Sequence, residues 1–396
     1  MRRVRTSGFT LIELMVAGMV ASVVMAAVYL TYTRSVRGYR VQSDVLDTYG
    51  RLRFGLDHIK ADVRRAGVSA TLNSNTDPFV RPPLPSQPLL SFMVLPAFPG
   101  SVPVQQNVNV EPVALLLFGD YFTHVVFPDS PATLPTTVAF PVQQIDGTTF
   151  HLDASTILLG EAEFKAAFLP ASNPDARLLH VEHRTEGTHY YFPIASADYS
   201  TMTITIGVPA PSALTSGIYK SIYVNPVGFV RYRIAADERA LVPDAEGNLQ
   251  APAGKTDLVR EEVAWNDVAG PAIAGTRLVL VENAVDLQLY DFVVDTAVQG
   301  QVPNLAVFPD VTSVVDVSGA GILGQGVTAR PEDLRFVTVK LSVRSADEDP
   351  DQPFVAREGV FAPLRRYEVD PAMEGSARVE SLALRVQLFN ATMRNM

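Results

Sequence analysis

The apolar segment from Phe9 to Leu30 constrains this chain more than any other feature of its sequence. It is long enough to cross a membrane as a helix, since about 20 apolar residues span a bilayer core, and Glu13 is its one charged residue. A basic leader with arginine at positions 2, 3 and 5 precedes it and ends in Gly8. An isolated carboxylate in a membrane span is unfavourable, so Glu13 marks a functional position.

The residues at the start of this segment resemble the processing motif of type IV prepilins and of the pseudopilins of type II secretion. The motif is Gly8-Phe9-Thr10-Leu11-Ile12-Glu13-Leu14. The resemblance implies that prepilin peptidase cuts the bond between Gly8 and Phe9, and that the new amine of Phe9 is methylated. It also implies that Glu13 becomes the fifth residue of the mature chain.

The chemistry of the same residues agrees with this expectation. Gly8 has no side chain, which suits a peptidase that grips the backbone at the membrane edge, and the leader arginines favour the anionic cytoplasmic surface. Glu13 needs a cationic partner. The amine of Phe9 on a neighbouring subunit would supply one and would set the axial register. The alternative is a plain signal anchor, whereas a secretory signal would be cut after its apolar region rather than before it.

The motif also decides the expected orientation. Arginines at positions 34, 37 and 40 follow the span as closely as the leader arginines precede it, so charge alone does not orient the helix. The resemblance implies a single-pass inner-membrane protein with a cytoplasmic N-terminus and a periplasmic head. The 396-residue chain contains no cysteine, so such a head folds without the disulfide that many pilins carry. A net charge of −10 without a basic cluster argues against nucleic acid as a partner.

The sequence predicts one helix from Phe9 to about Ala66, because no proline occurs before Pro78. At 1.5 Å per residue it would be roughly 85 Å long, and Gly67 is placed to end it. Beyond the membrane segment an apolar stripe at helical spacing predicts a face packed on a core. The stripe comprises Val41, Val45, Tyr49, Leu52, Leu56, Ile59, Val63 and Ala66. The expected exposed face comprises Arg40, Asp44, Asp47, Arg51, Arg53, Asp57, Lys60, Asp62 and Arg64.

These patterns predict an α+β fold in which a long N-terminal helix packs on an enlarged antiparallel β-sheet head, similar to type IV pilins. The expected segments are a leader at 1–8, a transmembrane half-helix at 9–30, an amphipathic half-helix at 31–67, an enlarged or inserted β-rich region at 68–227 and a C-terminal pilin-like β-sheet region at 228–396. Segment 52–67 and the order of the last strand-like runs also resemble PilW-like minor pilins.

Strands are expected where β-branched and aromatic runs are bounded by Pro and Gly. In the first β region these runs are 113–118, 122–127, 156–159, 178–183, 190–194, 202–208 and 218–224, with a short helical turn at 160–168. In the second they are 229–234, 258–264, 277–281, 285–292, 334–344 and 378–389.

Three histidines, His180, His183 and His189, cluster with Glu182 and Glu186. Metal sites use these residue types. Strand alternation, however, would put His180 and His183 on opposite faces. We therefore expect an exposed polar hairpin, with a metal site as the alternative.

An acidic segment offers a second candidate metal site. Asp347, Asp349, Asp351 and Glu358 occupy positions 1, 3, 5 and 12 of a calcium-loop pattern. Position 6 is Gln352 rather than the glycine that the sharp turn requires, and a proline follows it. We expect a solvated acidic loop between two strands, with calcium as the alternative cofactor and no firm metal site.

The sequence contains no nucleophile elbow, phosphate loop or dinucleotide fingerprint, so we expect no enzymatic activity. By resemblance, the expected function is that of a minor pilin that primes pilus assembly and sits at or near the tip, with roles in adhesion and motility. Its implied partners are prepilin peptidase, other minor pilins, the major pilin, a tip adhesin and the inner-membrane assembly platform. The alternatives are a minor pseudopilin of type II secretion and a membrane-anchored periplasmic binding or enzymatic domain.

Overall fold

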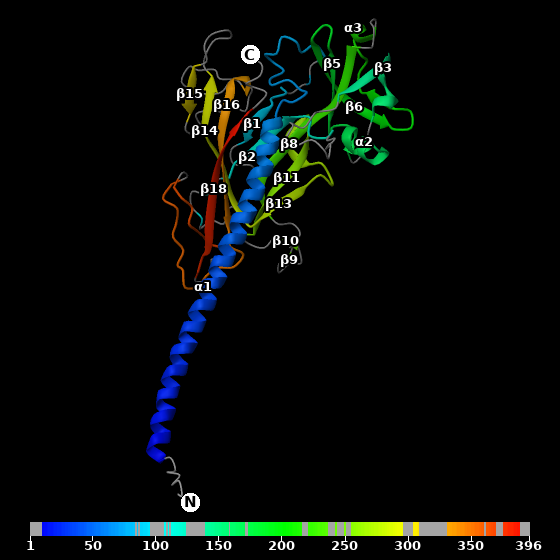
Figure 1. The fold of residues 1–396 in the computed structure, drawn as a ribbon. Coiled ribbons are helices and arrows are strands. Elements are labelled where there is room, and N and C mark those ends of the chain that lie inside the picture. Colours follow the sequence, from blue (N-terminus) through cyan, green and yellow to red (C-terminus); the bar gives the residue numbers. More distant parts are fainter. Residues whose placement is uncertain are drawn as a thin grey trace, which may run out of the picture. The chain divides into compact units, whose positions relative to one another are not determined.

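A computed structural model describes residues 10–83, 85, 88–95, 107, 110, 112–123, 139–157, 159–170, 173–215, 221–236, 242–243, 249–250, 255–295, 304–308, 331–359, 362–369 and 375–388. The chain forms two compact units, Met1–Gly50 and Arg51–Met396. The fold is α+β, as the sequence predicts: one long helix, α1 (Leu11–Arg65), is followed by antiparallel sheets (Figure 1).

In the first unit the helical backbone is continuous and its apolar side chains are exposed. In the part of the chain that the structure describes, α1 is the one helix long and apolar enough to cross a membrane. Two members of the predicted stripe, Val41 and Tyr49, are also exposed, at 45% and 42%. The stripe is therefore a buried face only in its second half.

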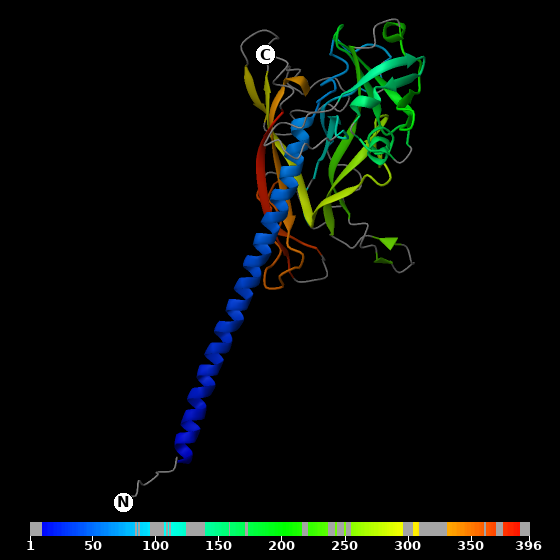
Figure 2. The same cartoon turned by 45° about the vertical axis from the view of Figure 1, so that its right-hand side comes forward.

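In the second unit the last turns of α1 pack on a core shared by two sheets (Figure 2). The predicted stripe residues of these turns are buried: Leu52, Leu56, Ile59, Val63 and Ala66. Gly55 permits close packing, because a Cβ there would lie 2.6 Å from Val281 and 3.0 Å from Leu341. The helix ends as predicted before Gly67, which has a φ of 73°. The prediction for Asp62 was wrong: this residue is buried rather than on the charged face.

The larger sheet has eleven strands, and β8 is its longest. Its strands are β1 (Phe92–Leu95), β2 (Ala114–Gly119), β3 (Phe140–Asp146), β4 (Thr149–Leu152), β5 (Leu178–His183), β6 (Thr188–Asp198), β7 (Thr203–Ile206), β8 (Ile222–Ala236), β11 (Thr256–Ala264), β12 (Asp267–Ala272) and β13 (Leu278–Glu282). The second half of β8 pairs with β2 on one side and β11 on the other.

The first half of β8 belongs to a closed ring of strands. The pairings run β8–β3–β4–β7–β6–β5 and return to β8, so these six strands have no free edge along that path. Their interior is a separate apolar core with phenylalanines from three strands, Phe140, Phe150 and Phe192. Two helices pack against it, α2 (Glu161–Phe168) and α3 (Ser212–Thr215). These six strands therefore form a small barrel that is continuous with the rest of the larger sheet through β8.

The C-terminal sheet has the strand order β15-β14-β16-β18-β17. Its strands are β14 (Ala284–Asp295), β15 (Leu305–Phe308), β16 (Leu334–Arg344), β17 (Arg366–Tyr367) and β18 (Ala377–Gln387). Alternate residues of β14 and β16, such as Leu289 and Val339, face the core around α1. The remaining elements are a two-stranded ribbon, β9 (Val242–Pro243) with β10 (Leu249–Gln250), and short 3-10 turns at Ala154–Thr156 and Pro331–Asp333.

Several strand predictions are confirmed and others are wrong. The runs at 178–183 and 334–344 coincide with β5 and β16, and the turn at 160–168 is α2. The run at 156–159 is not a strand in its described residues, because the carboxylate of Asp153 caps a 3-10 turn there, accepting from the amide of Ser155. The run at 122–127 lies mostly outside the described residues.

The runs at 218–224 and 229–234 are joined in a single strand, β8. The expected segment boundary after residue 227 falls inside this strand. Pro226 lies at this point, where the second partner of β8 changes from β3 to β2. A strand can do without an amide donor at such a gap.

Candidate functional site

The N-terminal segment that carries the processing motif begins outside the described residues, which exclude Gly8 and Phe9. The structure does describe Thr10 and Glu13. The amide and the hydroxyl of Thr10 donate to Glu13 Oε2 at 2.9 and 3.0 Å, and the amide of Glu13 donates to the Thr10 hydroxyl at 3.3 Å. This reciprocal pair is a capping box at the start of α1.

The capping box gives Glu13 a local role in the single subunit. One carboxylate oxygen, Oε2, holds the first turn of the helix, whereas Oε1 accepts no hydrogen bond from the described residues. A cation that approaches Oε1 would therefore not need to break the cap. The capping box was not among the expectations from the sequence, although Thr10-Leu11-Ile12-Glu13 has the T-x-x-E pattern that signals it.

A buried polar network fixes the other end of α1 to the larger sheet. Asp62 Oδ2 accepts from Arg260 Nε at 2.8 Å and from the Tyr232 hydroxyl at 2.5 Å. The backbone carbonyl of Asp62 accepts from the hydroxyl of Tyr121 at 3.2 Å. Burial, the largest influence, lowers the pKa of Arg260, but the Asp62 carboxylate and the Tyr232 hydroxyl together outweigh burial and raise this pKa. Burial and the negative charge of Asp62 raise the pKa of Tyr232.

One turn later, Arg65 fixes the end of the helix to the loop that follows β2. Its guanidinium donates to the carbonyl of Asp120 at 2.8 Å and lies over the ring of Tyr121, 5.4 Å from its centroid. The amide of Gly67 donates to the carbonyl of Phe118 at 2.8 Å. The contacts of Asp62 and Arg65 make the helix end and the sheet one structural unit, which suits a head carried by this helix.

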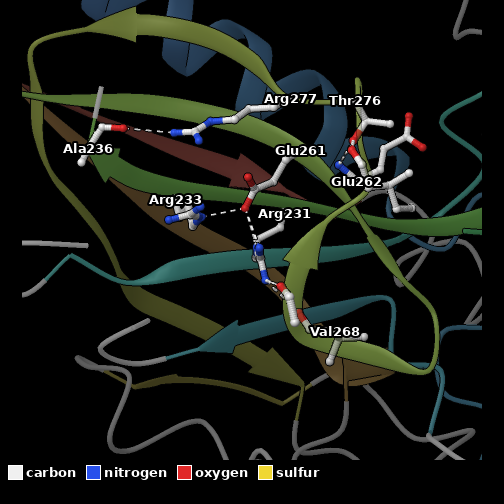
Figure 3. A network of polar contacts seen from close by, with 10 residues as sticks. Arg231, Arg233, Ala236, Glu261, Glu262, Val268, Thr276 and Arg277 are labelled. Carbon is white, nitrogen blue, oxygen red and sulfur yellow. Dashed lines mark hydrogen bonds and ion pairs between the residues drawn. The ribbon is translucent and has the colours of Figure 1, made fainter. Parts of the chain in front are cut away.

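Figure 3 shows a second charged cluster, on β8 and β11, in which Arg231 and Arg233 both point to Glu261. Glu261 Oε1 lies 2.6 Å from Arg231 and 2.7 Å from Arg233. Arg231 also donates to the carbonyls of Val268 and Gly270, at 3.1 and 2.9 Å. Burial would raise the pKa of Glu261, but the two arginines hold it below its usual value. Because Arg231 and Glu261 are almost completely buried, this cluster holds strands together rather than meeting a ligand.

The histidine group is not the exposed hairpin that the sequence suggested. His180 and His183 lie on β5 and are buried, at 3% and 7% exposure. His180 Nδ1 is 2.9 Å from the side-chain oxygen of Asn225, and His180 Nε2 is 3.0 Å from His189 Nδ1. Burial, followed by the charge of His189, lowers the pKa of His180 to about 3. These histidines are buried rather than exposed because β5 is a strand of the barrel, paired with β6 on one side and β8 on the other.

The hydrogen bonds of Asn225 fix which ring nitrogens of His180 and His189 donate and which accept. The amide nitrogen of Asn225 donates to the carbonyl of Ser69 at 3.2 Å and reaches Asp120 at 3.5 Å, so its oxygen faces His180. Neutral His180 therefore carries its proton on Nδ1 and accepts from His189 through Nε2. Both ring nitrogens of His180 are therefore occupied by protein partners, Nδ1 by Asn225 and Nε2 by His189.

No group of three His, Cys, Asp or Glu side chains that could hold a metal ion occurs among the described residues, which include both candidate sites. In the acidic segment, the carboxylate of Asp349 accepts from the amide of Asp351 at 3.1 Å. The side-chain oxygen of Gln352 accepts from Arg366 at 2.7 Å. The structure does not bring Asp347, Asp349, Asp351 and Glu358 together as a ligand set.

Comparison with protein-family models finds the prokaryotic N-terminal methylation motif at residues 3–29. Comparisons with curated proteins and with solved structures find no match. The motif covers the leader from residue 3, the predicted cleavage position, Glu13 and most of the apolar span, and it is consistent with membrane anchoring through α1. The methylation motif and the helix that follows it support a type IV prepilin-like protein.

Proposed function

We propose that this chain is a minor pilin of a type IV pilus, a structural subunit rather than an enzyme, that primes filament assembly and stays at or near the tip. The methylation motif at 3–29 carries this proposal, because it implies processing by prepilin peptidase and assembly with other pilins. In this account Gly8 and Phe9 flank the cut, Phe9 is methylated, and the head is periplasmic.

The architecture of the head favours a tip subunit over a repeating one. A shaft subunit must make the same contacts many times, so bulk added to its head is multiplied along the filament. Here a six-stranded barrel is added to the sheet that carries α1. A terminal subunit can accommodate this addition. A minor pseudopilin of type II secretion is the alternative, since the motif is shared.

The capping box suggests how Glu13 acts before and after assembly. In the single subunit, Oε2 caps the helix through Thr10. In the filament, Oε1 would receive the methylated amine of a neighbouring Phe9. Charge pairing would then hold the register, while the cap keeps the first turn helical.

Three variants separate the two roles of Glu13. Glu13→Gln keeps an oxygen that can accept from Thr10 but removes the charge, Glu13→Ala removes both, and Thr10→Ala weakens the cap but keeps the charge. We expect all three to be cleaved, and Glu13→Gln to assemble as poorly as Glu13→Ala, with Thr10→Ala closer to the wild type. The measurement is the amount of this subunit in sheared pili relative to membranes. Normal incorporation of Glu13→Gln would contradict the charge-pair role.

Co-purification distinguishes the two assembly systems. The intact protein, extracted from membranes in mild detergent, should bring down pilus minor subunits or the major pilin. Recovery of secretion-system pseudopilins instead would assign it to type II secretion.

A further inference from the structure

The outer face of the C-terminal sheet, opposite the core around α1, carries a groove of about 370 Å³. Three adjacent strands line it: β14, β16 and β18. Its polar lining residues are Gln288, Tyr290, Asp291, Lys340 and Ser381. Residues that alternate with them along β14 and β16 are buried against α1, so the groove faces away from the helix.

A backbone irregularity shapes this groove. The register of β14 against β16 shifts between Tyr290 and Val293, and Asp291 has a φ of +50°. Bulges of this kind re-aim side chains, and a non-glycine residue in the left-handed region marks a position held by its surroundings. The bulge brings Asp291 into the groove lining beside Tyr290.

Three polar groups of the groove have unused hydrogen-bonding capacity. The ammonium of Lys340, the hydroxyl of Tyr290 and the carboxylate of Asp291 make no hydrogen bond or ion pair within the described part of the chain. Burial lowers the pKa of Lys340 and raises that of Tyr290, as expected for groups partly withdrawn from water.

Two polar pairs lie on the same face of the sheet as the groove. Asp286 Oδ2 accepts from Arg357 at 3.0 Å, and the hydroxyls of Ser342 and Ser381 are 2.8 Å apart. These pairs leave Lys340, Tyr290 and Asp291 without a hydrogen-bond partner among the described residues.

The chemistry of the lining defines the ligand class. Lys340 donates, Asp291 accepts and Tyr290 can do either, and the two charges cancel. The groove also has an apolar lining residue, Ala383, which is paired with Lys340 in the sheet. A strand cannot add here, because β16 is already paired on both sides. A groove of this volume falls within the range of small-molecule sites, about 300–1,000 Å³. A compact, neutral ligand with hydroxyls around an apolar C–H face satisfies these conditions together.

We propose that this groove is a saccharide-binding site that holds a neutral sugar unit between Lys340, Asp291 and Tyr290. The sugar hydroxyls accept from the ammonium and donate to the carboxylate, and the C–H face covers Ala383. This property adds a recognition role to the head and does not depend on which filament the chain enters.

The test is saturation-transfer NMR on the full-length protein in a zwitterionic detergent that contains no sugar. The probes are glucose, galactose, N-acetylglucosamine and lactose, and an uncharged capped tripeptide is the comparison ligand. We expect at least one sugar to bind, with affinity reduced about tenfold or more in both Lys340→Met and Asp291→Gly, because each removes a charge-assisted hydrogen bond. Glycine suits the positive φ at position 291.

The control is Lys165→Met, since Lys165 is exposed and paired with Glu161 on α2; it should bind as the wild type does. Unchanged emission of Trp265, the single tryptophan, confirms that each variant is folded. The proposal is overturned if none of the four sugars binds, if Lys340→Met and Asp291→Gly bind as tightly as the wild type, or if the tripeptide takes the groove in their place.

Discussion

Replacing Asp62 by alanine should destabilise the head far more than the same replacement at Asp57, five residues earlier on α1. The Asp62 side chain is 7% exposed and contacts Arg260 and Tyr232, whereas Asp57 is 60% exposed and meets Arg53 at 3.7 Å. Both substitutions replace Asp by Ala within one helix, so the change in helix propensity is the same and cancels in the comparison.

The contacts set the expected size of the effect. Removing one partner of a buried ion pair costs about 3–5 kcal/mol, because it leaves the other charge without compensation. Arg260 keeps 15% side-chain exposure, and water can reach part of it. We therefore expect a loss of about 3–4 kcal/mol for Asp62→Ala. An exposed pair one turn apart contributes about 0.5 kcal/mol or less, which is the expected effect of Asp57→Ala.

The assay is urea unfolding of the full-length protein in detergent, followed by the emission of Trp265. This tryptophan packs against the core cluster around Phe118, so its emission reports on the head. The reasoning would be refuted if the two variants had free energies of unfolding within about 1 kcal/mol of each other. That result would mean that the network at Asp62 forms without fixing the helix to the sheet.

Three further predictions concern the packing at Gly55, the titration of His180 and the cleavage at Gly8. Gly55→Ala should lower the free energy of unfolding, measured in urea, by about 1–3 kcal/mol, because the new Cβ would overlap Val281. Gly50→Ala is the control and should be neutral or stabilising in the same assay, because nothing lies within 4 Å of a Cβ at that position. The folded-state pKa of His180 is lowered to about 3, so its contribution to stability is present above about pH 6.5 and is lost as the pH falls. Between pH 6.5 and 4 this loss is about 1.4 kcal/mol of unfolding free energy per pH unit, and His180→Gln should remove it. The pH dependence of the wild type must be compared with that of His180→Gln, because Asp286 acts in the opposite direction. Burial raises the pKa of Asp286 to about 6, so its contribution to the stability of the protein is lost as the pH rises. Replacing Gly8 by leucine should leave the precursor uncut, which an immunoblot for the larger form would show; normal processing would contradict the cleavage assignment.

The parts of the fold that sequence patterns predict well are those in which one signal dominates. The helix follows from the absence of proline and from the stripe at Leu52, Leu56 and Ile59. Strand β16 follows from clean alternation between its two faces. The burial of Asp62 was not predicted, because a charged residue close to Arg64 on a helix is typical of a solvated face. Its partners Tyr232 and Arg260 are distant in sequence.

The barrel was missed because its closure depends on pairing between distant strands. The hairpin of β3 and β4 had a local signal, Asp146 followed by Gly147, whose φ is +60°. The pairing of β5 with β8 has no such signal, and the sequence predicted two separate runs where β8 is one continuous strand. The groove at Lys340 depends on a bulge in β14, and no residue pattern in that segment predicts the bulge.

Processing at Gly8 tests the central claim most directly. The measurement is the intact mass and the N-terminal sequence of the protein purified from native membranes that contain prepilin peptidase. We expect a chain that begins at Phe9, carries one added methyl group and lacks residues 1–8. A chain that still begins at Met1 under these conditions would contradict the account of this protein as a processed pilin-like subunit.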